Sequence, residues 1–200
     1  VLPPKLAPYQ VVIVPIYKGQ EQLDAISEVA EGLMKELRAA GVTVKYDNRD
    51  THKPGWKFNQ YELQGVPVRI AIGPKDLEKG SVEVARRDTL TKQFMDQKDV
   101  ATAIPALLDQ IQNDLFAKAL AFREEHTHEA NTWEEFEELI KNSAGFVYAH
   151  WDGTSETEDR IKDMTKATIR CIPLNNKQEE GTCILTGKPS AQRVVFAKAY

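Results

Sequence analysis

Val66-Pro67-Val68-Arg69-Ile70-Ala71-Ile72-Gly73 is a mostly apolar run, typical of a strand that is buried on both faces of a sheet. Residues 10–16 form a similar run that is rich in β-branched side chains. Between the two runs, helical spacing of apolar residues over 23–37 is followed by a short strand at 42–46 and a helix at 54–65. This alternation of strands and helices predicts parallel strands joined by right-handed crossovers.

Residues 81–87 alternate between polar and apolar side chains, which is typical of an antiparallel edge strand with one solvated face. The first domain is therefore predicted to be a small α/β sandwich with a mixed sheet. Residues 100–125 follow the apolar pattern of one long helix, in which Pro105 fits only within the first turn.

A change of charge and a break in the helical pattern at residues 126–130 predict a domain boundary. We expect a first domain over residues 1–127 and a smaller α/β domain over residues 128–200. In the second domain the sequence predicts helices at 132–140 and 156–166 and strands at 146–150, 168–172 and 193–197. With roughly 75 residues, this domain is expected to need contacts with the first domain to bury enough apolar surface.

The composition is that of an ordinary soluble protein, with 42% hydrophobic and 28% charged residues in a chain of 200. No apolar run approaches the ~18 residues of a membrane helix, and residues 1–5 lack the pattern of a secretory signal. Two cysteines, Cys171 and Cys183, cannot form a multi-bridge framework. We therefore expect a cytoplasmic protein without a membrane partner.

Charge is distributed unevenly along the chain. The net charge of −4 argues against a strongly basic nucleic-acid binder. Residues 45–95 nevertheless carry ten basic and seven acidic side chains, whereas residues 96–163 carry six and sixteen. This asymmetry indicates a local basic surface that contacts a polyanion in one place. Charged residues that only solvate the surface would give the same counts.

The motifs of self-sufficient enzymes are missing from the sequence. It has no Walker-type phosphate loop, no Gly-x-Gly-x-x-Gly turn, no Gly-x-Ser-x-Gly elbow and no His-Glu-x-x-His pair. His126 and His128 lie in a Glu-rich hinge, where a solvent-exposed pair is the simpler interpretation. We therefore predict no catalytic residues in this chain.

Three charged side chains around the first quoted strand form the candidate binding site. Glu62 lies on the preceding helix, Arg69 lies on the strand and Lys75 follows it. A tight turn at Gly65 can bring all three to one edge of the sheet, outside the strand ends, where open α/β sheets bind ligands. Such a set suits guanine, because a carboxylate accepts from N1–H and the amino group while a cation donates to O6 and N7.

Aromatic and basic residues surround this set. Unpaired bases in single-stranded RNA stack on aromatic rings, and Trp56 and Phe58 are the candidates. Four basic side chains are candidates for the RNA backbone: Lys53, Lys57, Arg86 and Arg87. From the spacing alone, a surface ion pair between Glu62 and Arg69 with aromatics in the core explains the same pattern.

Residues 8–92 resemble the anticodon-binding domain of class II aminoacyl-tRNA synthetases. The phrases at 65–69, 72–77 and 86–88, which read Gly-Val-Pro-Val-Arg, Ile-Gly-Pro-Lys-Asp-Leu and Arg-Arg-Asp, are similar to those of the prolyl-tRNA synthetase family. The remainder, with its terminal Val194-Val195-Phe196-Ala197-Lys198-Ala199-Tyr200, resembles the C-terminal domain of the archaeal- and eukaryote-like type. The resemblance implies a small mixed five-stranded sheet flanked by helices, the class II synthetase anticodon-binding fold, followed by a smaller α/β domain.

The resemblance also implies roles for individual residues. In that family the two guanines of the proline anticodons are read by an acidic helix residue, an arginine after Gly-Val-Pro-x and a lysine after Gly-Pro. These positions match Glu62, Arg69 and Lys75, with Phe58 one turn before Glu62 as a stacking or packing neighbour. The terminal carboxylate of Tyr200 is implied to reach towards the active site of the intact enzyme.

The partners implied by the resemblance belong to a longer protein. They are the tRNA for proline, a catalytic domain in the same chain that uses ATP and Mg²⁺, and a second copy in a homodimer, with no DNA. The parent reaction activates proline with ATP to an adenylate and transfers it to tRNA. Because the catalytic core lies N-terminal to this chain, the fragment itself is expected not to be catalytic and to hold no cofactor.

The C-terminal domain of the family often binds zinc through four cysteines, two of them in a Cys-x-x-Cys pair. Here Thr186 stands where the partner of Cys183 would be, and no cysteine lies near Trp151-Asp152. One thiolate cannot complete a tetrahedral site, so we predict no zinc and two reduced structural cysteines. His150 and Asp152 are the remaining candidates for substitute ligands.

The sequence leaves two alternatives to tRNA recognition. A regulatory or scaffold protein that reuses the fold for protein contacts would leave Glu62, Arg69 and Lys75 idle. A small-molecule enzyme with a flavodoxin-like fold is disfavoured because the sequence contains no catalytic constellation.

Overall fold

The computed structural model describes residues 1–142 and 145–199. It divides into two compact units, Val1–Lys118 and Ala119–Tyr200. The division falls inside helix α4 (Val100–Glu125), whose last turns group with the second unit, whereas the charge pattern predicts a boundary after residue 127.

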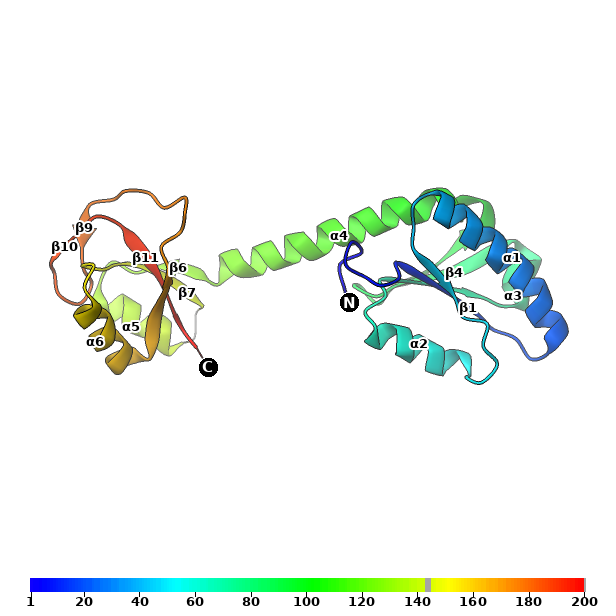
Figure 1. Ribbon diagram of the computed structural model, residues 1–200, viewed down its shortest axis with the longest axis horizontal. Coiled ribbons are helices and arrows are strands. Elements are labelled where there is room, and N and C mark those ends of the chain that lie inside the picture. The colour runs from blue at the N-terminus through cyan, green and yellow to red at the C-terminus, as the bar shows by residue number, and fades with distance from the viewer. Residues whose placement is uncertain (143–144, 200) are drawn as a thin grey trace. The chain divides into compact units, whose positions relative to one another are not determined.

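The first unit is built on a mixed five-stranded sheet, which confirms the predicted fold class (Figure 1). The strand order is β2-β1-β3-β4-β5. The strands are β1 (Val11–Pro15), β2 (Val44–Tyr46), β3 (Val68–Ile72), β4 (Ser81–Arg86) and β5 (Lys92–Asp96). β1 pairs in parallel with β2 and β3, and the β3–β4 and β4–β5 pairs are antiparallel. The edge position predicted for residues 81–87 is therefore wrong, because β5 continues the sheet beyond β4.

Helices cover the two faces of this sheet unequally. The helices are α1 (Gln20–Ala39), α2 (Pro54–Leu63), α3 (Pro74–Lys79) and the first part of α4. α1 and α4 share one apolar core with alternate residues of the central strands. α2 lies on the opposite side of the sheet, as Figure 1 shows, and packs Tyr61 against Val12 and Val14 of β1.

The side of the sheet that carries α2 is open over its antiparallel half. Along β3, Val68, Ile70 and Ile72 enter the core with α1 and α4, so Arg69 and Ala71 point to the other face. The cross-strand register places Glu83 of β4 opposite Ala71 and Phe94 of β5 opposite Glu83. Phe94 is 73% exposed, so this part of the face is available to a ligand.

The second unit is a smaller α/β fold. Its four-stranded sheet has the order β6-β7-β11-β8, and the strands β9 and β10 form a separate two-stranded sheet. The elements are β6 (Thr127–Glu129), α5 (Trp133–Lys141), β7 (Phe146–His150), α6 (Ser155–Thr165), β8 (Ala167–Cys171), β9 (Gly181–Thr182), β10 (Pro189–Ser190) and β11 (Arg193–Lys198). Thr132 and Thr154 cap the two helices by accepting from the backbone N–H of Glu135 and Thr157. The predicted second α/β domain is confirmed.

None of the described helices combines the length and the apolar character needed to cross a bilayer.

We expect Phe136→Ala to destabilise the second unit alone. Phe136 is fully buried and packs edge-on against Phe196, with 5.1 Å between ring centroids, in a core separate from those of the first unit. Truncation should cost about 3–5 kcal/mol of unfolding free energy. Hydrogen exchange should show loss of protection in β7 and β11 with β1 and β3 unchanged. Ile70→Ala should give the reverse pattern, and equal losses in both sheets would contradict separate cores.

Candidate nucleic-acid interface

A cavity of about 240 Å³ lies where α2 meets the open face of the first sheet. We call it the first cavity. Its charged and aromatic lining comprises Phe58, Tyr61, Glu62, Arg69, Arg86, Arg87 and Lys92. The cavity therefore combines one helix carboxylate with several cations, as the sequence predicts for Glu62 and Arg69.

A tight reversal between α2 and β3 brings Glu62 and Arg69 together. The turn at Gly65 has a φ of +76°, a left-handed conformation that favours glycine. A Cβ there would also lie 2.6 Å from the Cγ of Leu2, whose N–H donates to the Gly65 carbonyl at 2.9 Å. Because the turn is short, the last turn of α2 and the start of β3 face the same cavity.

Arg69 is held from two sides. Its guanidinium carbon lies 3.7 Å from the centroid of the Phe58 ring, a close cation–π contact. Its Nη2 donates to Glu83 Oε1 at 3.1 Å, while its buried Nε has no hydrogen-bond partner among the described residues. Phe58 therefore supports Arg69, and the face of its ring towards Arg69 is covered.

Glu62 does not pair with Arg69. The closest approach of its carboxylate to a described cation joins Oε2 to Arg87 Nε at 3.8 Å, and its side chain is 44% exposed. Arg69 is paired with Glu83 instead. The Glu62–Arg69 surface ion pair is thus not formed, and the Glu62 carboxylate is available to a ligand.

Lys75 lines a different cavity. This second cavity has a volume of about 550 Å³ and is bordered by Lys18, Lys75, Lys79, Glu83 and Phe94, among others. The expectation that all three readers meet at one edge of the sheet is wrong. Arg69 is the second residue of β3 and Lys75 lies beyond its end, so a strand that rises about 3.3 Å per residue separates them. Glu83 joins the two cavities, because it lines the second and binds Arg69 of the first.

The four candidates for the RNA backbone differ in exposure. Lys53 is exposed at the start of α2, and the Arg87 side chain is 32% exposed beside Glu62. Lys57 is only 1% exposed, because its ammonium group donates to the carbonyls of Asp47 and Arg49. The ammonium group of Lys57 is therefore not accessible to a phosphate of the RNA backbone.

Arg86 is also largely committed inside the protein. Its Nη2 pairs with Asp88 at 2.7 Å and with Asp114 of α4 at 2.9 Å, and its side chain is 14% exposed. Together these contacts tie the end of β4 to α4. Arg86 is therefore a structural residue rather than a good candidate for the RNA backbone.

A buried charged cluster fixes the loop that leads into α2. The Asp47 carboxylate accepts from Arg49 Nε at 2.8 Å, from Arg49 Nη2 at 2.6 Å and from the Tyr61 hydroxyl at 3.1 Å, and Lys57 Nζ lies 3.8 Å away. Burial alone would raise the pKa of Asp47, but these donors outweigh it and lower that pKa to about 2. Burial, with the Asp47 charge, raises the pKa of Tyr61 to about 12.

Two charged residues near Arg69 were not predicted from the sequence, Lys92 of the first cavity and Glu83 of the second. Glu83 and Lys92 lie on neighbouring antiparallel strands, with Lys92 Nζ 3.6 Å from Glu83 Oε1. The alternation of residues 81–87 already indicates that Glu83 points away from the core. Only the register between β3 and β4, however, shows that it reaches Arg69.

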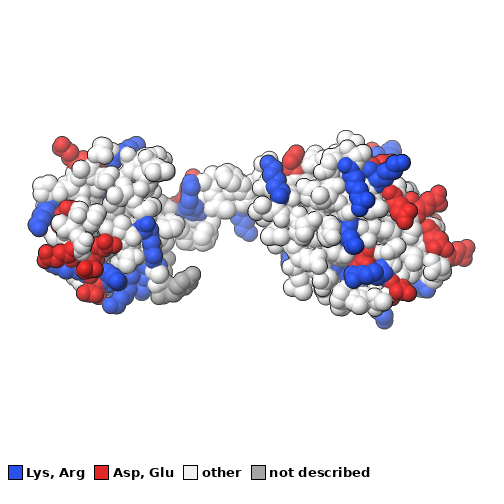
Figure 2. Space-filling model, viewed as in Figure 1, with Lys and Arg blue, Asp and Glu red and all other residues white. Residues whose placement is uncertain are grey.

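Figure 2 shows that neither sign of charge covers the face of the first unit that is in view. Lys and Arg stand in small groups among uncharged side chains, and acidic side chains gather towards one end. The basic character expected from residues 45–95 is therefore local, which is compatible with the net charge of −4.

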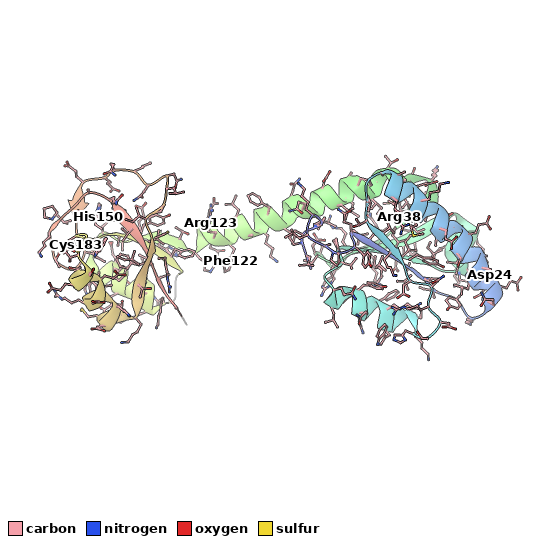
Figure 3. All side chains as sticks on the ribbon, viewed as in Figure 1. Asp24, Arg38, Phe122, Arg123, His150 and Cys183 are labelled. Carbon is pink, nitrogen blue, oxygen red and sulfur yellow. The ribbon has the colours of Figure 1, made fainter. Side chains whose placement is uncertain are left out.

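The residues expected near a zinc site form hydrogen bonds instead. Asp152 accepts from the hydroxyls of Thr154, Thr157 and Thr186, each at 2.9 Å. His150, labelled in Figure 3 with Cys183, has its Nδ1 3.0 Å from Ser190 Oγ. Within residues 1–142 and 145–199, no group of three or more His, Cys, Asp and Glu side chains is arranged to hold a metal ion. The C-terminal Tyr200 lies outside the described residues.

Comparison with protein families agrees with this architecture. Residues 10–107 match the model of the anticodon binding domain, and residues 133–200 match the model of the prolyl-tRNA synthetase C-terminal domain. The chain belongs to the prolyl-tRNA synthetase family. The resemblance stated from the sequence is thereby confirmed.

Individual members of the prolyl-tRNA synthetase family are similar to the chain over its whole length. It is 63% identical to a proline–tRNA ligase of Christiangramia forsetii and 60% identical to one of Porphyromonas gingivalis, covering 41% and 40% of those proteins. A crystal structure of prolyl-tRNA synthetase from Cryptosporidium parvum, complexed with L-proline and AMP, matches with a TM-score of 0.90 at 32% identity. That match covers 100% of this chain and 42% of the other. The chain thus spans about two fifths of the length of the curated relatives it matches.

We expect the Asp47 cluster to make the free energy of unfolding depend on pH under acidic conditions. Because the pKa of Asp47 in the folded state is lowered from 3.8 to about 2, its contribution is present above about pH 4 and is lost as pH falls towards 2. Urea titrations should show that Asp47→Asn removes about 2 kcal/mol of this acid-dependent stability. Asp109→Asn, which changes an exposed carboxylate, should leave the profile unchanged, and equal profiles for wild type and Asp47→Asn would contradict the cluster.

We also expect the second unit to fold without metal. Elemental analysis should find no stoichiometric zinc, and a chelator should leave the thermal transition unchanged. Thr186→Val should destabilise the unit by about 1 kcal/mol, because Asp152 loses one hydrogen-bond donor. Bound zinc, or unfolding on chelation, would contradict this expectation.

Proposed function

We propose that this chain is the tRNA-recognition part of a proline–tRNA ligase and that it reads the two guanines of the proline anticodon. The observation that carries the proposal is the placement of an immobilised arginine, Arg69, beside an available carboxylate, Glu62, at one cavity of an open sheet face. Membership of the prolyl-tRNA synthetase family and the match to the anticodon binding domain support it.

The first cavity suits one guanine. The carboxylate of Glu62 accepts from N1–H and the amino group, and the guanidinium of Arg69 donates to O6 or N7. Phe58 and Glu83 already restrict Arg69, so little rotamer freedom remains to be lost when the base binds. Arg87, next to Glu62, is then close enough to contact the adjoining phosphate or the base.

The second cavity takes the other guanine. Lys75 lies at its border, and its ammonium group donates to the O6 or N7 acceptors of that base. Reading by two neighbouring cavities replaces the single pocket expected from the sequence. It also suits two consecutive nucleotides, which cannot occupy one pocket together.

The chemistry of the whole enzyme lies outside this chain. We propose that a catalytic domain in the same polypeptide binds ATP and Mg²⁺, forms prolyl-adenylate and transfers proline to tRNA. In this proposal the intact enzyme is a cytoplasmic homodimer that does not bind DNA, and the chain alone binds tRNA without turnover. Tyr200 is proposed to direct its carboxylate towards that active site.

An anticodon stem-loop with guanines at the second and third anticodon positions should bind more tightly than one with adenines there. Arg69→Ala should weaken binding to the guanine RNA about 5- to 150-fold and relax selectivity, which fluorescence anisotropy can measure. Arg69→Lys should also lose selectivity, because lysine keeps the charge without the planar contact to Phe58.

Lys35 provides the matched control for Lys75. It is exposed on α1, which covers the opposite face of the sheet, so Lys35→Ala should leave base selectivity intact while Lys75→Ala reduces it. Equal affinity of the wild-type chain for both RNAs would favour a scaffold role over tRNA recognition.

A further inference from the structure

An exposed phenylalanine stands on the edge strand of the first sheet. Phe94 is 73% exposed and lies near the middle of β5, whose other residues are mostly polar. A free strand edge is a place where proteins usually avoid exposed apolar side chains. Phe94 borders the second cavity, so its ring is part of a concave site rather than of a convex surface.

A small side chain lies at the base of the second cavity, and larger side chains border it. Ala71, Glu83 and Phe94 lie opposite one another on β3, β4 and β5, so their side chains are direct neighbours on the open face. The methyl group of Ala71 leaves the space that the ring of Phe94 borders. The volume of about 550 Å³ is within the range of sites for small ligands.

The charge of this cavity is positive once internal pairs are considered. Lys18, Lys75 and Lys79 border it, and none of them forms an ion pair within the part of the chain that the structure describes. Of its two acidic residues, Glu83 is paired with Arg69 and Lys92, whereas Asp76 accepts from the N–H of Gly73 at 2.8 Å and keeps its charge, so three lysines face one unpaired carboxylate. An aromatic ring beside an excess of cations fits an unpaired nucleotide, which supplies a base that can stack and a phosphate that neutralises charge.

We infer that the guanine of the second cavity stacks on Phe94 and that Lys18 and Lys79 contact the phosphates flanking it. This inference rests on the proposed function and assigns to the same surface a stacking residue and two backbone contacts. Lys75 reads the base edge, whereas Phe94 holds the base plane. Phe58 cannot perform the second task on its Arg69 side, because that side is covered.

The test measures binding of the 200-residue chain to four anticodon stem-loops. One carries both guanines, two carry an abasic nucleotide at one guanine position each, and one carries two adenines. Phe94→Ala should weaken binding to the first RNA at least about fivefold, whereas Phe94→Tyr should stay within about threefold of wild type. The effect of Phe94→Ala should vanish on one abasic RNA, where Lys75→Ala is also silent, and persist on the other.

Phe116→Ala serves as the matched control. Phe116 is 67% exposed on α4 and does not border either cavity, so its removal should leave all four affinities unchanged. Lys18→Ala and Lys79→Ala should each lower the slope of log affinity against log salt by about 0.7, while Lys35→Ala should not.

The outcomes separate the two proposals. If the wild-type chain prefers guanines but Phe94→Ala binds like wild type, or loses affinity equally on both abasic RNAs, the stacking role is wrong and the proposed function stands. If the wild-type chain does not distinguish guanines from adenines, the proposed function fails and the stacking role fails with it.

Discussion

The guanidinium group of Arg69 lies against an aromatic ring and is bound by a carboxylate, and the proposed site depends on this arrangement. Phe58 comes from α2 and Glu83 from β4, so the two supports lie on either side of β3. The conformational entropy of a long side chain is therefore lost when the protein folds, not when the ligand binds. Both supports reach Arg69 because β3 follows the crossover helix α2 in the chain and pairs antiparallel with β4.

Much of the first unit could be predicted because its central strands are buried on both faces. All five residues of β1 are buried, and in β3 only Arg69 is not, so their apolar runs carry no helical period. The proximity of Glu62 and Arg69 could also be predicted, because a helix end and a strand start joined by a short turn are neighbours in space. Local connectivity is sufficient for such a contact.

Contacts that depend on long-range register or on loop conformation could not be predicted in this way. β5 is exposed along almost its whole length and shows no two-residue alternation, so β4 resembled an edge strand. Glu83 reaches Arg69 only through the β3–β4 register. Lys57 looked like a surface cation, and its burial depends on two carbonyls that only the folded loop brings together.

The buried ammonium group of Lys57 is the cation that two backbone carbonyls of the loop before α2 enclose. It is coordinated by the carbonyl oxygens of Asp47 and Arg49, and the Asp47 carboxylate lies nearby. Because this cation is covalently part of the chain, its place in the loop is filled without a dissolved ion. If this domain binds RNA as proposed, the cation that orders the loop before α2 is not among the counterions released on binding.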